Sequence, residues 1–147
     1  MSQLYCEVVR RLIVTAAVLA VAAVSSAQAA TSPEAVARAW SRALNANDNE
    51  RAARLFAPNA RVIQPGVDVR LATHRLAVAF NNALPCAGRI TTITVNGERA
   101  TATFILGTRP KHLCGGRGQK AAALFVVHNG KIVRWQQVAV PQGPTAY

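Results

Sequence analysis

Few side chains in this sequence could act as a general acid or base. The 147-residue sequence holds only 6 Asp and Glu residues, and most of them stand where a helix or a turn is predicted to begin. Asp68 is the exception, because it lies between a predicted strand and a predicted helix, six residues before His74. A His–Asp pair can act as general acid and base. Asp68 and His74 are therefore the candidate catalytic pair, and the alternative is a solvated turn residue beside an exposed helix residue.

Other chemistries find less support in the sequence. It contains no Cys-x-x-Cys or His-x-x-x-His pair, so we expect no metal site. It also lacks a nucleophile elbow and a Rossmann glycine pattern, and we expect no cofactor. A glycine-rich basic segment, 107–118, carries Arg109, Lys111, His112 and Arg117. Its backbone N–H groups and cations could hold an anion, and a solvated loop is the alternative.

The first 29 residues match a secretory signal peptide. Arg10 and Arg11 precede an apolar run, 12–24, which is followed by small residues up to Ala29. The alternative is an uncleaved anchor helix, but the run is shorter than the ~20 residues that span a bilayer. We therefore expect cleavage after Ala29 and a secreted or extracytoplasmic protein. Cys6 would leave with the signal peptide.

Two cysteines, Cys86 and Cys114, then remain in an exported chain. An even number in an oxidising compartment indicates a disulfide. A two-residue turn at Asn96-Gly97 would place Cys86 opposite Gly107, close to Cys114 at one end of the sheet. A metal site is the alternative, but it would need more ligands than this region offers. The sequence therefore predicts a Cys86–Cys114 disulfide.

The chain after the signal peptide is strongly basic. From Ala30 onward it has 15 Lys and Arg against 5 Asp and Glu, a net charge of about +10. Such a charge favours anionic partners such as an envelope surface. The arginines are scattered, however, and no series of aromatic residues alternates with them. We expect a generally basic surface, at most a weak contact with an anionic envelope, and no specific nucleic acid partner.

Capping residues predict three helices near the start of the mature chain. Ser32 with Pro33, then Asp48, then Thr73 are suited to begin them. We expect the first to end near Asn45-Ala46-Asn47, the second to continue to Pro58, and the third to end near Leu84. The expected buried stripe of the third helix is Leu76, Ala77, Phe80 and Leu84.

A short strand is predicted at 60–64, followed by a Pro65-Gly66 turn and a brief extended segment at 67–71. Two long hairpins are predicted after the third helix. Their turns are Asn96-Gly97 and Asn129-Gly130, the strongest short hairpin signals. Counting from the second turn pairs Leu124 with Trp135 and Phe125 with Arg134. We expect one domain over residues 30–141 and an unstructured tail over 142–147.

This order of elements resembles the nuclear transport factor 2-like superfamily, also called SnoaL-like. The resemblance rests on Val36–Trp40 with Asn47-Asp48, on Leu55–Ala60, and on His128–Trp135. It implies an α+β fold in which three N-terminal helices pack on a curved, mostly antiparallel sheet, a cone around an apolar pocket. Homodimers through the outer face of the sheet also occur in this superfamily.

The superfamily includes ketosteroid isomerases, polyketide cyclases and non-catalytic pocket proteins. Its enzymes generally place a carboxylate in the pocket, whereas the four long predicted strands contain no Asp or Glu in their interiors. The expected function is therefore non-catalytic binding of a small apolar ligand or a protein partner. The alternative is a SnoaL-type lyase, isomerase or cyclase that uses Asp68 and His74. The aromatic residues expected at the pocket, with core packing as their alternative role, are Trp40, Phe80, Phe104 and Trp135.

Overall fold

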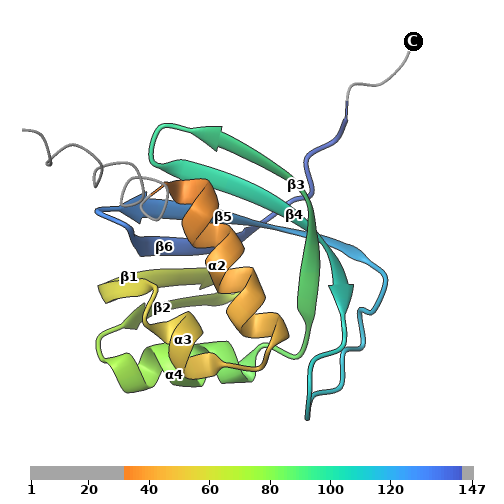
Figure 1. Cartoon of the computed structure of the whole chain (residues 1–147), viewed down its shortest axis with the longest axis horizontal. Helices are drawn as coiled ribbons and strands as arrows, with labels where there is room; N and C mark the ends of the chain where they lie inside the picture. The colour runs from red at the N-terminus through yellow and green to blue at the C-terminus, as the bar shows by residue number, and fades with distance from the viewer. Residues whose placement is uncertain (1–31, 144–147) are drawn as a thin grey trace, which may run out of the picture.

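A computed structural model of the chain describes residues 32–143 (Figure 1). The predicted signal peptide and its cleavage site lie outside these residues, as do the last four residues of the predicted tail. None of the helices in the described part is long and apolar enough to cross a membrane. The elements in chain order are α2 (Pro33–Asn45), α3 (Asn49–Ala53), β1 (Phe56–Gln64), β2 (Val67–Leu71), α4 (His74–Ala83), β3 (Ala87–Asn96), β4 (Arg99–Gly107), β5 (Lys120–His128) and β6 (Lys131–Val138).

The six strands form one curved sheet in the order β2-β1-β6-β5-β4-β3. All neighbours are antiparallel except β1 and β6, which are parallel. Figure 1 shows α2 crossing in front of the strands and α3 and α4 below it. Helix α2 packs on β3, β4 and β5, while α4 contacts α3 and β2. The expected α+β fold with helices on one face of the sheet is confirmed.

The predicted start of α2 is confirmed. The Ser32 hydroxyl accepts a hydrogen bond from the Ala35 N–H at 3.1 Å, and Pro33 occupies the first helical turn. One face of the helix is buried against the sheet, as the helical spacing of its apolar residues predicts. Its buried apolar residues are Val36, Ala37, Trp40, Ala43 and Leu44.

The second helix is shorter than the sequence predicts. Asp48 caps it as expected, by accepting a hydrogen bond from Arg51 N–H, but it ends at Ala53. Phe56 already belongs to β1 and pairs with Ile132 of β6. Both of these side chains are buried, so the strand gains apolar contacts that a longer helix would lose. Pro58 lies where the β1–β6 register shifts, a position that tolerates the missing N–H.

The second hairpin contains a bulge that was not predicted from the sequence. Asn129 and Gly130 form the turn with φ of 49° and 73°, and His128 pairs with Lys131 as expected. The register then shifts by one residue, so that Phe125 pairs with Trp135. The expected pairs of Leu124 with Trp135 and of Phe125 with Arg134 are therefore wrong. The bulge keeps both aromatic rings on the buried face.

The first hairpin turns one residue later than expected. Asn96 pairs with Arg99, so that Gly97, with φ of 58°, and Glu98 form the turn. The register then shifts between Ile90 and Thr92, so that Ala87 lies opposite Gly107. The sequence had predicted Cys86 at the position opposite Gly107. This one-residue error does not affect the disulfide, because Cys86 directly precedes β3 and still lies beside the connecting loop.

The predicted disulfide between Cys86 and Cys114 is confirmed, with a Cα–Cα distance of 4.8 Å. It ties the beginning of β3 to the loop between β4 and β5.

Helix α4 presents most of the expected stripe to the core. Thr73 caps it as predicted, through a hydrogen bond from the Leu76 N–H at 3.2 Å. Ala77 is buried, and Phe80 and Leu84 are half-buried and pack against the core. Leu76 is the exception, because it is 45% exposed, and the fully buried Asn81 belongs to the stripe instead. Since Asn81 is polar, apolar periodicity alone does not identify it as buried.

The disulfide predicts a measurable stability difference. Replacing both cysteines in the C86S/C114S variant opens a loop of 28 residues, which should lower the free energy of unfolding by about 3–4 kcal/mol. Urea denaturation of the variant and of the reduced wild-type protein should give the same lower midpoint. An unchanged midpoint would show that the bond does not constrain the chain.

Candidate functional site

A pocket of about 230 Å³ lies between α2, the end of α4 and the helix-covered face of the sheet. Trp40, Phe104 and Trp135 contribute aromatic walls. Successive alanines on β5 line another wall, and their small side chains leave the space that larger residues would fill. These alanines are Ala121, Ala122 and Ala123.

No titratable side chain lines this pocket in the described part of the chain. Its polar side chains are Ser41, Gln64 and Gln137, and Cys86 is held in the disulfide. The Ser41 hydroxyl donates a hydrogen bond to the Gly88 carbonyl at 3.0 Å. An apolar wall without charge favours an uncharged guest, because burying an unpaired charge is costly.

Trp40 is the central residue of the aromatic wall. Its indole N–H donates to Asn81 Oδ1 at 2.8 Å, and its ring lies 5.3 Å from the Phe125 ring and 5.8 Å from the Trp135 ring, centre to centre. Phe80 does not line the pocket; its ring packs against Phe56 and Trp135, with centroid distances of 5.9 and 5.3 Å. Three of the four expected aromatic residues thus lie at the pocket, and Phe80 supports one of them from behind.

The indole N–H of Trp135 has a different environment. It is buried and has no hydrogen-bond acceptor among residues 32–143. A buried donor without a partner costs about 1–3 kcal/mol. The aromatic wall therefore carries one donor that the described protein atoms leave unused.

Asp68 lies outside the pocket, on the opposite face of the sheet. The Arg61 guanidinium donates to both of its carboxylate oxygens, from Nε to Oδ1 at 2.7 Å and from Nη2 to Oδ2. This pairing lowers the pKa of Asp68, and the positive charge of Arg134 adds to the effect. The Asp68 side chain is 47% exposed. A general base near neutral pH needs a raised pKa, so the environment acts in the opposite direction.

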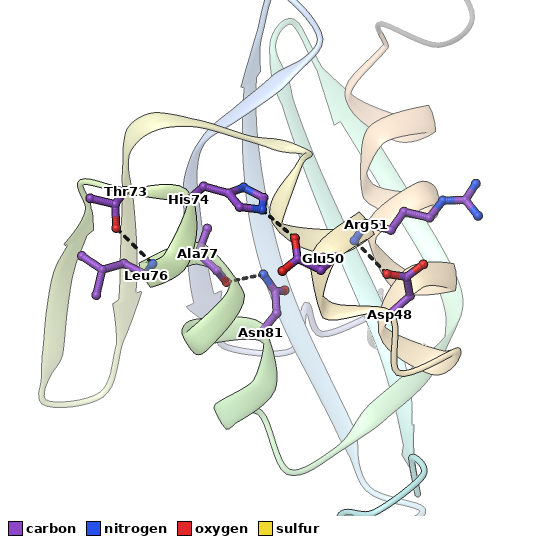
Figure 2. Close-up of polar contacts among 8 residues, drawn as sticks. All are labelled: Asp48, Glu50, Arg51, Thr73, His74, Leu76, Ala77 and Asn81. Carbon is purple, nitrogen blue, oxygen red and sulfur yellow. Dashed lines mark hydrogen bonds and ion pairs between the residues drawn. The ribbon is translucent and has the colours of Figure 1, made fainter.

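His74 also lies at the surface, on α4. Figure 2 shows its ring directed toward Glu50, and the Nε2–Oε2 distance is 2.7 Å. The His74 side chain is 52% exposed and lies outside the pocket lining. Asp68 and His74 therefore have different partners and do not form the pair that their spacing suggested.

Of the buried polar residues whose roles were not predicted from the sequence, two connect separate elements. Asn81 is fully buried, where it accepts the Trp40 N–H and donates from Nδ2 to the Ala77 carbonyl at 2.8 Å (Figure 2). Because its side chain is polar, it was not predicted to lie on the buried face of the helix. Its position four residues after Ala77, on the same side of the helix, was the available signal.

Arg109 is the second, with 3% of its surface exposed. Its guanidinium donates to the backbone carbonyls of Asn81 at 2.7 Å and Leu84 at 2.9 Å, and to the side-chain oxygens of Asn47 and Asn49. Burial among these neutral acceptors lowers the pKa of Arg109. Because its donors are already used, Arg109 is not free to hold an anion in the loop, as the sequence had suggested.

Metal binding has no candidate group within residues 32–143, where three or more His, Cys, Asp or Glu side chains do not come together.

The family model described as a SnoaL-like domain matches residues 37–135. Comparison with curated proteins finds no match.

Solved structures give the same fold at low sequence identity. An NTF2-like protein of unknown function from Cytophaga hutchinsonii superposes with a TM-score of 0.60 and 11% identity, over 73% of this chain and 88% of that one. A candidate polyketide cyclase from Sinorhizobium meliloti gives 0.56 and 23%, over 70% and 93%. A candidate ketosteroid isomerase from Kribbella flavida gives 0.58 and 20%, over 78% and 83%. At these identities the likeness establishes the fold alone.

The Arg61–Asp68 pair predicts a pH effect. In the R61Q variant the pKa of Asp68 should rise toward the ordinary aspartate value, which a carboxyl-carbon NMR titration would measure. In the wild type this carboxylate stabilises the fold above its ordinary pKa, and the contribution is lost as pH falls through the lowered folded-state value. A raised pKa of Asp68 in the wild type would contradict this account.

Removal of the Arg109 guanidinium should destabilise the fold. The R109L variant leaves a buried carbonyl, a half-buried carbonyl and two side-chain amides without their donor, so we expect a loss of about 2–4 kcal/mol in the free energy of unfolding. R117L, which removes an exposed arginine from the same loop, is the matched control and should lose less than about 0.5 kcal/mol. Equal losses in the two variants would contradict a structural role for Arg109.

Proposed function

The chain belongs to the SnoaL-like domain family, and we propose that it is a non-catalytic member whose pocket binds a small, uncharged, mostly apolar ligand. The observation that carries the proposal is the pocket wall, in which no titratable side chain takes part among the described residues. Proton-transfer catalysis needs an acid or base within hydrogen-bond reach of the substrate. The pocket can instead bind a ligand through its shape and its apolar surface.

The size of the pocket limits the ligand. About 230 Å³ is below the ~300–1,000 Å³ of pockets that enclose drug-sized molecules. A compound with one or two rings suits this volume. The aromatic side chains of Trp40, Phe104 and Trp135 would contact its apolar faces.

The polar atoms around the pocket suggest one further feature of the ligand. Gln64 and Gln137 line the pocket, and their side chains make no hydrogen bond with the described residues. A carbonyl or ether oxygen on the ligand would satisfy one of these donors without adding a charge. A small ketone is therefore a better probe than a hydrocarbon.

Catalysis by Asp68 and His74 is the weaker candidate. Asp68 is bound to Arg61 and His74 to Glu50, and neither lines the pocket. Any turnover of a substrate should persist in the D68N and H74Q variants. The names of the structural neighbours do not alter this, since related folds host many functions.

We further propose that the domain acts outside the cytoplasm. The signal-peptide pattern of residues 1–29 supports this location. The Cys86–Cys114 disulfide also supports it, because such bonds persist mainly in oxidising compartments.

A pair of matched probes tests the pocket. 2-Acetylnaphthalene is uncharged, whereas 2-naphthoate has similar size and carries one negative charge. The ketone should bind at least tenfold more tightly, since no described cation lines the pocket to pair with a carboxylate. Quenching of tryptophan fluorescence would measure both affinities, because Trp40 and Trp135 form part of the wall.

Two variants provide the control. A123F fills the pocket from the β5 wall and should abolish binding of the ketone, while A79F adds the same ring at an exposed position of α4 and should leave it intact. Equal affinity for the two probes, or an unaffected A123F variant, would contradict the proposal.

A further inference from the structure

Four arginines form a row across the sheet. Direct strand pairing places Arg70 beside Arg61, Arg61 beside Arg134, Arg134 beside Val126, and Val126 beside Arg99. The row therefore runs from β2 through β1, β6 and β5 to β4, with Val126 as its only uncharged member. These positions are far apart in the sequence, which explains why the arginines look scattered there.

The row lies on the face of the sheet away from the pocket. Side chains alternate between the two faces of a strand. Val62, Phe125 and Trp135 follow or precede members of the row and are buried beneath the helices. The arginines consequently point to the other side, where Arg61, Arg70 and Arg99 are exposed and Arg134 is half-buried.

The outer face is hollowed along the row. A depression of about 360 Å³ is lined by all four arginines together with Asn59, Val126 and Val133. Neighbouring strands are about 4.8 Å apart, so the row extends over about 19 Å at its base. Arginine side chains are long enough for several guanidinium groups to reach one ligand in the depression.

The charge of this face is poorly balanced within the protein. Asp68 is bound to Arg61, but Arg70, Arg99 and Arg134 make no hydrogen bond or ion pair with any residue of the described chain. Like charges directly opposite each other destabilise a sheet. Asp68 offsets part of the repulsion within the Arg70–Arg61–Arg134 alignment, and a bound anion would relieve the remainder.

We propose that this arginine row binds a small anion that carries three or more negative charges on phosphate or carboxylate groups. Guanidinium groups bind both kinds of oxyanion through paired hydrogen bonds. The four arginines and Asp68 together supply a net charge of +3. None of the described residues that line the depression is aromatic, so they offer no base-stacking contacts to a single-stranded nucleic acid.

Thermal unfolding with tripolyphosphate as the probe tests the site. Without the anion, the midpoint of R134Q is measured first as the baseline for its response, because Arg134 both repels Arg61 and attracts Asp68. At a tripolyphosphate concentration ten times its Kd, the wild-type midpoint should rise by about 4 °C. The rise in R134Q should fall below about 1 °C, and the affinity measured by calorimetry should drop at least tenfold.

Matched controls separate this site from general charge. R75Q removes an exposed arginine from α4, away from the row, and should keep the wild-type response to tripolyphosphate. A123F, which fills the pocket on the other face, should also keep it, so a failure of the pocket proposal leaves this test intact. Citrate should act in the same way as tripolyphosphate.

Several results would overturn the proposal. One is an equal loss of the response in R75Q and R134Q, and another is a wild-type shift reproduced by sodium chloride at the same ionic strength. The proposal also fails if the midpoint does not move. Tighter binding of a single-stranded oligonucleotide than of tripolyphosphate, with the same dependence on Arg134, would assign the face to nucleic acid instead.

Discussion

The buried side chain of Asn81 connects the elements on which the pocket depends. Its Oδ1 accepts the Trp40 N–H from α2, its Nδ2 donates to the Ala77 carbonyl within α4, and its own carbonyl accepts from Arg109. Arg109 then reaches the Leu84 carbonyl and the loop between α2 and α3. Trp40, Ala77, Asn81 and Arg109 are buried, so losing one of the hydrogen bonds among them leaves a buried group unsatisfied. The remaining acceptors of Arg109 are half-buried. The network thereby fixes Trp40, the central aromatic residue of the wall, relative to both helices.

The two faces of the sheet have opposite character. The face under the helices carries alanines and aromatic rings, and it leaves a hollow without a charged group among the described residues. The outer face carries the arginine row and Asp68. A homodimer through the outer face, as the superfamily resemblance suggests, would bring two such rows together and would need anions or acidic groups between them. The charged side chains thus lie on the outer face of the sheet, where water can solvate them.

Local chemistry made part of this structure predictable. Ser32, Asp48 and Thr73 cap their helices as expected because an N-cap depends on only a few neighbouring residues. The turn at Asn129-Gly130 and the single disulfide follow from similarly short-range or compositional signals.

Features that depend on long-range packing could not be predicted in the same way. The register shift in β6 serves to bury Trp135 beside Phe125, which no local pattern encodes. Arg109 lies in a glycine-rich basic segment that resembles a solvated loop, and its acceptors come from three distant elements. The arginine row exists only once five strands are aligned. Spacing in the sequence likewise suggested Asp68 and His74 as a pair, although the sheet directs them to separate surfaces.

Among residues 32–143, no group that gains or loses a proton lines the pocket. The pH dependence of the affinity for an uncharged ketone tests this most directly. Between pH 5 and pH 9 we expect a constant dissociation constant, because none of the described lining side chains titrates there. A sigmoidal or bell-shaped dependence that persists in D68N and H74Q variants would reveal an ionisable group within the wall and contradict the account.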